Sequence, residues 1–337
     1  MRILVTGGMG AVGRPTVEWL MGHGHTVRVL DLSVDEPIPG AECREGDITD
    51  FASLSDHMQD MQGVVHLAAF PHPSMAPPQR IFQVNDGGTF NVFQAAIDAN
   101  KRGDAEIRRI VCAGSINALG YNFGVVFPED QIRYFPIDEQ HPTYTTDPYS
   151  FSKRTIEEIG GYFWRREGLS SLFLRYPAIY DLNTDEPSML LDFVEGARQQ
   201  TAAVMSLPEQ ERQARIAEII ADFKRRARGR EWEKAFDWSF PDAHIMLGRS
   251  NFWTCLDVRD AAQAAEKGLL ADYAGSHPVY VTQADNFIGL PSRELAEAFF
   301  PEVTTWKKPV TGTQSLVSIE KIRELIGFEP VYPFKSR

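Results

Sequence analysis

The chain has 337 residues, 43% of them hydrophobic, which is enough to bury a sizeable core as one large domain or two closely joined ones. Its formal net charge of −12 argues against nucleic acid or an anionic membrane as the main partner. The three cysteines stand far apart and in no CxxC pair, so we expect buried thiols of a reducing compartment and neither a disulfide framework nor a zinc site. No apolar run approaches the ~18 residues of a membrane span, and residues 1–6 already read as a strand where a signal peptide would stand. These features predict a soluble, cytoplasmic protein.

Short β-branched runs alternate with helical patterns in the first half of the chain. The runs that read as strands are Ile3–Thr6, Val27–Asp31, Gly63–Ala68, Arg109–Ala113 and Ser171–Tyr176. Helical patterns follow Gly10 and begin at Phe51, Asn85 and Asp147. Strands alternating with helices predict an α/β fold with a doubly wound parallel sheet.

A glycine-rich loop follows the first expected strand. MRILVTGGMGAVG places Gly7, Gly10 and Gly13 between this strand and an amphipathic helix. One glycine of such a loop makes the turn, one lets the backbone approach a pyrophosphate and one lets helix pack on strand. Asp31 ends the next strand, where an aspartate accepts from the adenosine ribose hydroxyls and its charge repels a 2′-phosphate. The full context predicts a dinucleotide site that prefers NAD to NADP, and we discount Arg28, within the strand, as a 2′-phosphate partner.

The segment GDITD at 46–50 follows a strand-like stretch. Asp47 is placed to bond the adenine amino group while Ile48 covers the ring. Asp47 is equally suited to cap the helix expected from Phe51 to Met58, so the two interpretations stay open.

The stretch DPYSFSK at 147–153 carries a tyrosine four residues before a lysine. An N-cap Asp147 followed by a proline starts a helix, which puts Tyr149 and Lys153 on one helix face. An ammonium near a phenol favours the phenolate and lowers the pKa of the phenol. The two residues are either a proton-transferring base or an amphipathic surface pair.

These motifs stand in one chain order with HLAA at 66–69, Asn85 in VNDGGTFNVFQAA and Ser115 in AGSINALG. The set resembles the extended short-chain dehydrogenase/reductase family, the NAD-dependent epimerase/dehydratase group, over residues 1–181. The resemblance continues more loosely from Phe252 to Phe334, through DVRDAA and SIEKIRELIGFEP. It implies a Rossmann-like NAD-binding domain at 1–181 and a smaller C-terminal substrate-binding lobe at 182–337, interleaved or not with the Rossmann sheet. The helical segment 186–235 within this lobe is longer than a typical member carries.

The resemblance assigns roles to the matched residues. Tyr149 takes the hydroxyl proton while hydride leaves the same carbon for the nicotinamide, and Lys153 lowers the tyrosine pKa and holds the nicotinamide ribose. Ser115 orients the alcohol, although without Tyr149 it would be read as a cap after a strand. The expected cofactor-binding residues are Gly7, Gly10, Ala11, Val12, Gly13, Asp31, Asp47, Ile48, Leu67, Ala68, Ala69, Asn85, Tyr149, Lys153, Tyr176, Ala178 and Ile179. The expected substrate-binding residues are Ser74, Ser115, Asn117 and Tyr149, and no His/Asp/Glu cluster has metal-ligand spacing.

The residues after Ser115 bear on the reaction. Family dehydratases carry an acidic pair shortly after this serine, whereas residues 116–119 here are INAL, so we expect no dehydration. Asn117 and the SxxxxG spacing resemble members that oxidise a free sugar or sugar acid, such as uronate dehydrogenases. Asn117 falls one residue later than the asparagine of those members. RYPAIY at 175–180 resembles the segment that passes the nicotinamide, with Asp181 where a glycine is usual. We expect an NAD-dependent oxidoreductase acting on a secondary hydroxyl of a carbohydrate, with an NAD-retaining sugar epimerase and a non-catalytic NAD-binding regulator as alternatives.

Several other residues and segments have both a structural and a functional interpretation. In the helical segment, residues 216, 219, 220 and 223 form an apolar face that can pack on the core, cover the active site or meet another subunit, possible in a homodimer. The basic cluster at 224–230 is suited to an anion site, but we favour a solvated helix end. His66 is read as a packed core histidine, and His72 with Ser74 as substrate contacts or parts of a stiff proline-rich loop. His244, Arg249 and Trp253 are candidates for the pocket lining.

Overall fold

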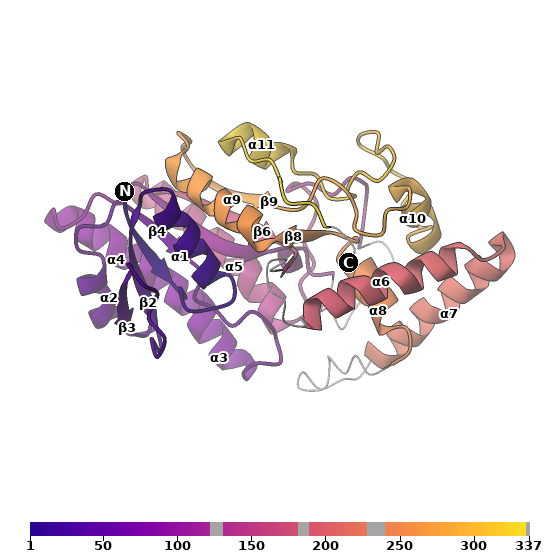
Figure 1. Ribbon diagram of the computed structural model, residues 1–337, viewed down its shortest axis with the longest axis horizontal. Helices are drawn as coiled ribbons and strands as arrows, with labels where there is room; N and C mark the ends of the chain where they lie inside the picture. The colour runs from indigo at the N-terminus through magenta and orange to yellow at the C-terminus, as the bar shows by residue number, and fades with distance from the viewer. Residues whose placement is uncertain (122–130, 181–188, 228–239, 335–337) are drawn as a thin grey trace.

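The computed structural model describes residues 1–121, 131–180, 189–227 and 240–334, and in its core is a sheet of seven parallel strands (Figure 1). The strands are β1 (Arg2–Thr6), β2 (Thr26–Asp31), β3 (Glu42–Glu45), β4 (Gly63–His66), β5 (Arg109–Ser115), β6 (Ser170–Tyr176) and β9 (Ser276–Tyr280). A separate two-stranded sheet pairs β7 (Ala178–Tyr180) with β8 (Cys255–Asp257). The doubly wound, Rossmann-like sheet predicted from the sequence is confirmed.

The strand order is β3-β2-β1-β4-β5-β6-β9, so the chain runs outward from β1 in one direction and from β4 in the other. β1 therefore lies between β2 and β4, with Ile3 opposite Val27 on one side and Gly63 on the other. This reversal is the topological switch point, and in open α/β sheets ligands bind beyond the carboxyl ends of the strands at such a point.

Helices cover both faces of the sheet (Figure 1). One face packs against α1 (Gly13–Gly22), α9 (Val258–Leu270) and α11 (Glu320–Ile326). The other packs against α2 (Phe51–His57), α4 (Gly88–Arg102) and α5 (Pro148–Glu167). α3 (Pro78–Phe82) runs into α4 through η1 (Gln83–Gly87), a single π-helical turn, so Asn85 lies inside this turn and not at a helix start.

Two features of helix α5 explain where it begins and why it holds its place. Its first turn is capped by Asp147, which accepts a hydrogen bond from the Ser150 amide at 2.7 Å, and Pro148 is the first helical residue. In its middle, Glu157 forms a bidentate ion pair with Arg175 of β6, at 2.7 and 2.9 Å, and both side chains are buried. Because an unpaired buried charge is costly, this pair fixes α5 against the sheet.

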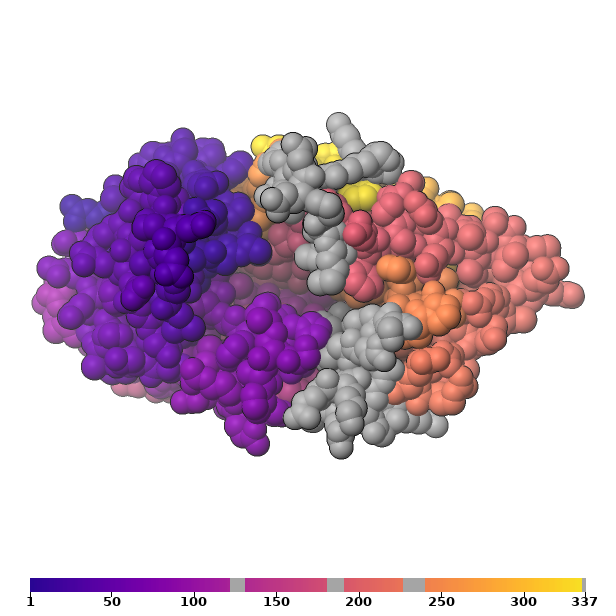
Figure 2. Space-filling model, turned by 60° about the horizontal axis from the view of Figure 1, so that its bottom comes forward, coloured from indigo at the N-terminus to yellow at the C-terminus, as the bar shows by residue number. Residues whose placement is uncertain are grey.

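The C-terminal part of the chain builds a second hydrophobic core next to the sheet. It contains α6 (Met189–Met205), α7 (Glu209–Ala227), α8 (Ala243–Ser250) and α10 (Ser292–Phe299). Figure 2 shows the residues of α6, α7 and α8, in pink to orange, at the end of the molecule opposite the indigo N-terminal residues. On α7, Ile216, Ile219 and Phe223 are buried in this core, so the apolar face found in the sequence packs inside the chain.

The two parts of the chain are interleaved. β9 and α9, from the C-terminal half, complete the main sheet and one of its helical layers, while residues 135–137 hydrogen-bond with residues 305–318. The division at residue 181 remains a prediction, and it lies in a segment, 181–188, outside the described residues.

Candidate active site

The glycine loop connects β1 to α1 and is shaped by very close backbone contacts. Gly7 has a φ of +72°, and a Cβ added there would meet the Ala68 amide nitrogen at 2.6 Å. A Cβ at Gly13 would meet the Gly7 carbonyl oxygen at 2.1 Å, so the helix can start this close to the strand only as glycine. At Gly10 the nearest atom is the Gly7 carbonyl oxygen at 3.4 Å, so protein contacts alone leave room for a methyl group.

The start of α1 has the properties of an anion site. Among the described residues, no side chain caps the helix, whose N-cap position is Val12, and Ala11 is exposed. Amides at a helix N-terminus that no side chain caps fit a phosphate group. Gly10 lies beside them, and since no protein atom there requires a glycine, its small size suits the close approach of a ligand. The loop therefore fits the pyrophosphate of a dinucleotide.

Asp31 lies next to this loop at the end of β2. Its carboxylate accepts hydrogen bonds from the amides of Met9, at 2.9 Å, and Leu32, at 2.8 Å, and the side chain is partly exposed. It is thus oriented by the glycine loop at the position expected of a ribose-binding carboxylate. Arg28 is engaged elsewhere, since it pairs with Glu42 at 2.9 Å and donates to the carbonyl of His57.

Asp47 and Ile48 follow β3. The helix cap of α2 is Asp50, which accepts from Ala52 and Ser53, so the cap interpretation of Asp47 is wrong. Asp47 instead accepts from the Thr49 amide at 2.8 Å and lies 3.8 Å from the Arg80 guanidinium. Ile48 is buried and packs so tightly on α4 that a Cβ at Gly88 would meet its Cδ1 at 2.4 Å.

The residues that follow β4 lie against the glycine loop. β4 ends at His66, and Leu67, Ala68 and Ala69 are half-buried beyond it, with the Leu67 amide donating to Thr6 at 3.0 Å. His66 lies between the hydroxyls of Thr6, at 2.7 Å, and Thr89, at 3.0 Å. Burial lowers the pKa of His66 to about 3, so it is a packed, neutral core histidine as the sequence suggests.

Asn85 joins the loop after β4 to helix α5. Its side chain accepts from the Phe70 amide at 2.8 Å and donates to the Ser152 hydroxyl at 2.9 Å. Single π-helical turns often occur at functional sites, and here the turn directs this amide between two segments that carry expected site residues. Ser74, in the same loop, is exposed and shares a 2.7 Å hydrogen bond with His72.

Ser115 and Tyr149 lie together at the carboxyl end of β5. Ser115 ends the strand, and its hydroxyl accepts from the Asn117 amide at 3.1 Å, so it caps η2 (Ile116–Leu119). A side-chain hydrogen bond also joins Ser115 to Tyr149, at the start of α5. Both side chains are buried, which rules out the surface-pair interpretation of Tyr149.

Lys153 completes the group. It is buried, its ammonium donates to the Ala113 carbonyl at 2.8 Å, and it lies 5.8 Å from the centre of the Tyr149 ring. Burial raises the pKa of Tyr149 to about 12, the hydrogen bond from Ser115 lowers it and Asp147 raises it. The net pKa is thus not lowered in this structure, and a lowering by Lys153 stays a prediction for the complex with cofactor and substrate. Burial likewise lowers the pKa of Lys153, to about 8.

Asn117 has an unused acceptor. It is buried, and in the described part of the chain its side-chain oxygen has no hydrogen-bond partner. A buried amide oxygen left unpaired two residues from Ser115 is suited to a hydroxyl donated by a ligand. Of the other expected residues, Tyr176 faces Ser115 across β5 and β6 but donates its own hydroxyl to Ala261 at 3.0 Å. Ala178 and Ile179 are half-buried in β7.

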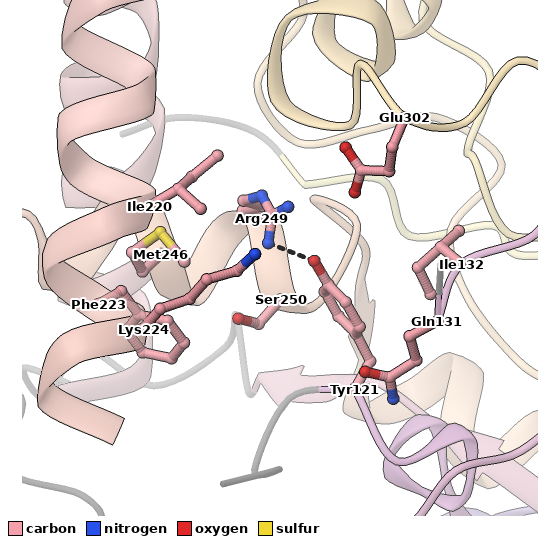
Figure 3. A pocket seen from close by; sticks show the side chains of 10 residues that line it. All are labelled: Tyr121, Gln131, Ile132, Ile220, Phe223, Lys224, Met246, Arg249, Ser250 and Glu302. Atoms are coloured by element: carbon pink, nitrogen blue, oxygen red, sulfur yellow. Dashed lines mark hydrogen bonds between the residues drawn. The ribbon is translucent and has the colours of Figure 1, made fainter. Parts of the chain in front are cut away.

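A hollow in the C-terminal core lies between Tyr121, shortly after η2, and the helices α7 and α8 (Figure 3). Its lining consists of Tyr121, Gln131, Ile132, Ile220, Phe223, Lys224, Met246, Arg249, Ser250 and Glu302. Arg249 is buried, donates to the Tyr121 hydroxyl and the Phe299 carbonyl, and stacks on the Phe300 ring at 4.3 Å. His244 instead contacts Gln200 of α6, and Trp253 is fully buried in the core.

Comparison with known proteins decides the family. A model of the NAD dependent epimerase/dehydratase family matches residues 3–213, well over half of the chain. The chain belongs to this family. It is 33% identical over 187 residues to a UDP-glucose 4-epimerase of Lacticaseibacillus casei, covering 52% of the chain and 51% of that protein. It is 32% identical over 216 residues to an L-arabinose 1-dehydrogenase (NAD(P)(+)) of Haloferax volcanii, covering 61% and 78%.

The chain thus spans about half the length of the epimerase it matches, and solved structures show that the fold likeness extends further. A UDP-N-acetylglucosamine 4-epimerase from Bacillus cereus matches with a TM-score of 0.60 at 22% identity, over 99% of this chain and 94% of that one. A short-chain dehydrogenase/reductase superfamily protein from Agrobacterium tumefaciens, solved with bound NAD, matches with a TM-score of 0.61 at 24% identity, over 99% and 93%. At these identities the structures establish the fold of the family member described here.

Two residues of this family member, Asp86 and Arg249, were missed or could not be singled out from the sequence. Asp86, buried beside Asn85, escaped notice because an aspartate in a helical pattern is read as solvent-facing. Arg249 was only one of three lobe candidates, and no sequence signal separated it from the other two. Within the described residues, no group of three His, Cys, Asp or Glu side chains could hold a metal ion, and no helix is long and apolar enough to cross a membrane.

Proposed function

We propose that this protein is an NAD-dependent oxidoreductase that transfers hydride from, or to, a secondary hydroxyl carbon of a free sugar or sugar acid. The observation that supports it best is the buried Ser115–Tyr149 hydrogen bond at the carboxyl end of β5, with Lys153 one turn further along α5. A hydroxyl pair of this kind can hold an alcohol oxygen and accept its proton.

The cofactor is NAD, and the glycine loop, Asp31 and the loop after β4 are the residues that hold it. The open amides at the start of α1 bind its pyrophosphate, and Asp31 binds the adenosine ribose and disfavours a 2′-phosphate. When bound, NAD supplies the hydride acceptor or donor. Within the described residues Lys153 donates one hydrogen bond, to Ala113, and its other donors would be available to the nicotinamide ribose.

Each catalytic residue has a separate task. Tyr149 accepts the proton of the substrate hydroxyl, for which its raised pKa must fall in the working complex, and the Lys153 ammonium is the positive charge that favours this. Ser115 orients the substrate oxygen and donates to it as charge develops. Asn117 offers its buried side-chain oxygen, which has no partner among the described residues, to a neighbouring hydroxyl of the sugar.

A sugar epimerase that retains its NAD is the second candidate, because the same residues serve both reactions and the matched relatives include epimerases. One feature favours net oxidation of a free sugar: the Arg249 guanidinium already donates to Tyr121 and Phe299 and stacks on the Phe300 ring, which leaves it less able to clamp a diphosphate. The lack of an acid at residues 116–119 argues against dehydration and does not separate the two candidates.

The test is to incubate the purified protein with NAD and a panel of free sugars, uronates and nucleotide sugars, following NADH absorbance and product stereochemistry together. We expect NADH to accumulate with a free sugar or a uronate. Inversion of a nucleotide sugar without net NADH would establish the epimerase, and neither product would contradict both candidates.

Tyr149→Phe is the matching variant, since it removes the hydroxyl and keeps the ring. We expect turnover to fall about 100-fold or more, with NAD affinity nearly unchanged, measured by steady-state kinetics and cofactor titration. Tyr162→Phe, on the exposed side of the same helix, is the control and should retain activity. Retention of most activity in Tyr149→Phe would remove the catalytic assignment.

A further inference from the structure

Asp86 is a buried acid that the proposed mechanism does not use. Its side chain is 3% exposed, and neither carboxylate oxygen has a hydrogen-bond partner among the described residues. An unpaired buried carboxylate costs several kcal/mol at most sites, and natural chains rarely keep one without a functional reason.

The position of Asp86 is fixed by its neighbour. Asn85 donates to Ser152 at 2.9 Å, which holds the π-helical turn η1 against the first turns of α5. Ser152 directly precedes Lys153, so the turn that carries Asp86 packs beside the turn that carries the lysine. The Lys153 ammonium acts on the Asp86 carboxylate, and the carboxylate acts on the ammonium.

Lys153 needs a counter-charge. It is 3% exposed, and in the described part of the chain it donates one hydrogen bond, to the neutral Ala113 carbonyl. The titratable groups around it are His66 on β4, Cys112 on β5, Tyr149 on α5 and Asp86 on η1. His66 is held neutral between two threonine hydroxyls, burial raises the pKa of the Cys112 thiol, and burial also keeps the Tyr149 phenol protonated. Burial raises the pKa of Asp86 as well, to about 8, and the Lys153 ammonium acts to lower it. Asp86 is therefore the member of this set best able to carry a negative charge, and it carries that charge increasingly as the pH rises toward and above 8.

We propose that Asp86 is a positioning residue whose carboxylate is the counter-charge that keeps the Lys153 ammonium charged beside Tyr149. The role in turnover rests on the proposed function, whereas the effect on Lys153 does not. Burial lowers the pKa of Lys153 and the Asp86 carboxylate raises it again, so without the carboxylate the lysine loses its proton at lower pH. A neutral lysine gives the Tyr149 phenolate no support.

The direct test is a pH titration of Lys153 by NMR in protein labelled with carbon-13 at the lysine ε position, the resonance being assigned from its loss in Lys153→Met. In Asp86→Asn we expect the Lys153 midpoint to fall by about one pH unit or more, and the two-step behaviour of a coupled pair to become a single step. Asp98→Asn is the matched control. Asp98 acts on Arg166, which lies 13 residues, or about 20 Å, along α5 from Lys153, so its loss should leave the Lys153 midpoint unchanged.

Thermal unfolding separates this role from a structural one. Because the Asp86 oxygens accept no hydrogen bonds in the described structure, and because Lys153 can release its proton when the counter-charge is lost, Asp86→Asn should remain folded and melt close to the temperature of the unmodified protein. Asp86→Val supplies a second neutral variant with the same expected shift. An unchanged Lys153 midpoint in the neutral variants, or loss of the fold in both, would overturn the proposal.

The activity arm distinguishes the two proposals. With a substrate in hand, the alkaline limb of kcat/KM in Asp86→Asn should move to lower pH together with the Lys153 midpoint. If the midpoint shifts while no substrate of the panel is turned over, the proposed function fails and the role of Asp86 stands. If turnover is normal and the midpoint does not shift, the role of Asp86 fails and the function stands.

Discussion

Burial sets the proton affinities of the residues around Tyr149. The phenol is buried, which raises its pKa to about 12, and the Asp147 carboxylate two residues earlier raises it further. The same burial raises the pKa of Asp147 to about 6, although its carboxylate accepts a hydrogen bond from the Ser150 amide. Burial therefore disfavours the charged forms of both Tyr149 and Asp147. Catalysis requires a positive charge close to the Tyr149 phenol, so that the phenol can lose its proton.

Asp147→Asn should stabilise the fold at neutral pH. The folded pKa of Asp147, about 6, lies above the unfolded value of about 3.9, so its contribution to stability is present at low pH and is lost as pH rises through 6. Asparagine keeps the N-cap and carries no charge. We expect the free energy of unfolding at pH 7 to rise by about 1–3 kcal/mol, with little change at pH 3, measured by urea denaturation at both pH values. A less stable variant at pH 7 would contradict this reasoning.

Asp31→Ala tests the ribose carboxylate. Asp31 is aligned by the amides of Met9 and Leu32, and its charge disfavours a 2′-phosphate. We expect the preference for NAD over NADP to narrow by about tenfold or more, mainly because NAD binds less tightly, measured by titration with both cofactors. Asp35→Ala, on the following exposed turn, is the control. An unchanged ratio would show that another group selects the cofactor.

At the scale of elements, strand ends and helix starts position every site residue. β1, β2, β4 and β5 all present their carboxyl ends at the switch point, and α1 and α5 begin beside them. The Glu157–Arg175 ion pair then fixes α5 to β6, so that Tyr149 and Lys153 meet the end of β5 in one register. Local caps alone would start the helix but would not place it.

Gly10→Ala and Gly13→Ala should separate cofactor binding from folding. A methyl group at Gly13 would collide with the Gly7 carbonyl oxygen at 2.1 Å, so we expect a loss of about 2 kcal/mol or more in the free energy of unfolding. At Gly10 the nearest atom is 3.4 Å away, so the fold should hold while the pyrophosphate loses space. We expect the Kd for NAD in Gly10→Ala to rise at least about tenfold at nearly unchanged Tm, by titration and thermal unfolding. Equal effects of both variants on Tm would contradict the distinction.

At the scale of the whole molecule, an aromatic stripe crosses the outer surface of α5. Phe151 and Tyr162 are 11 residues apart, about three full helical turns, so they lie on one face of α5. Each stacks on a ring from the neighbouring helical segment, Phe151 on Phe82 and Tyr162 on Phe90, and all four rings are 38–50% exposed. An exposed apolar stripe of this size is typical of a protein–protein contact.

If two copies of the chain associate, as the sequence leaves open, we expect the contact to use this stripe, because it is an exposed apolar patch that can meet its own copy around a twofold axis. Phe151→Glu should convert the dimer to a monomer, measured by light scattering after size-exclusion chromatography. Leu32→Glu, at a 70% exposed leucine outside the stripe, should leave the assembly unchanged. A dimer that persists in Phe151→Glu would contradict this expectation.

The sequence by itself determined the order of elements in the first half of the chain and the edge of the sheet that carries the site. The five expected strands, the α5 start at Asp147 and Pro148, and the glycine loop all rest on local signals, namely alternation, caps and close-packed glycines. These signals act over a few residues, so they can be read before the chain is folded. The positions of Ser115, Tyr149 and Lys153 in one chain order then indicated the chemistry.

Only the tertiary structure decided the electrostatics and the boundary of the lobes. The high pKa of Tyr149 arises from burial by segments far away in the chain, as do the side-chain oxygens of Asp86 and Asn117 that have no partner within the described residues. β9 joins the sheet from residue 276 onward because β6 leaves an open edge that a distant strand can cover. Burial and long-range strand pairing depend on which surfaces meet, and no local pattern in this chain specifies that meeting.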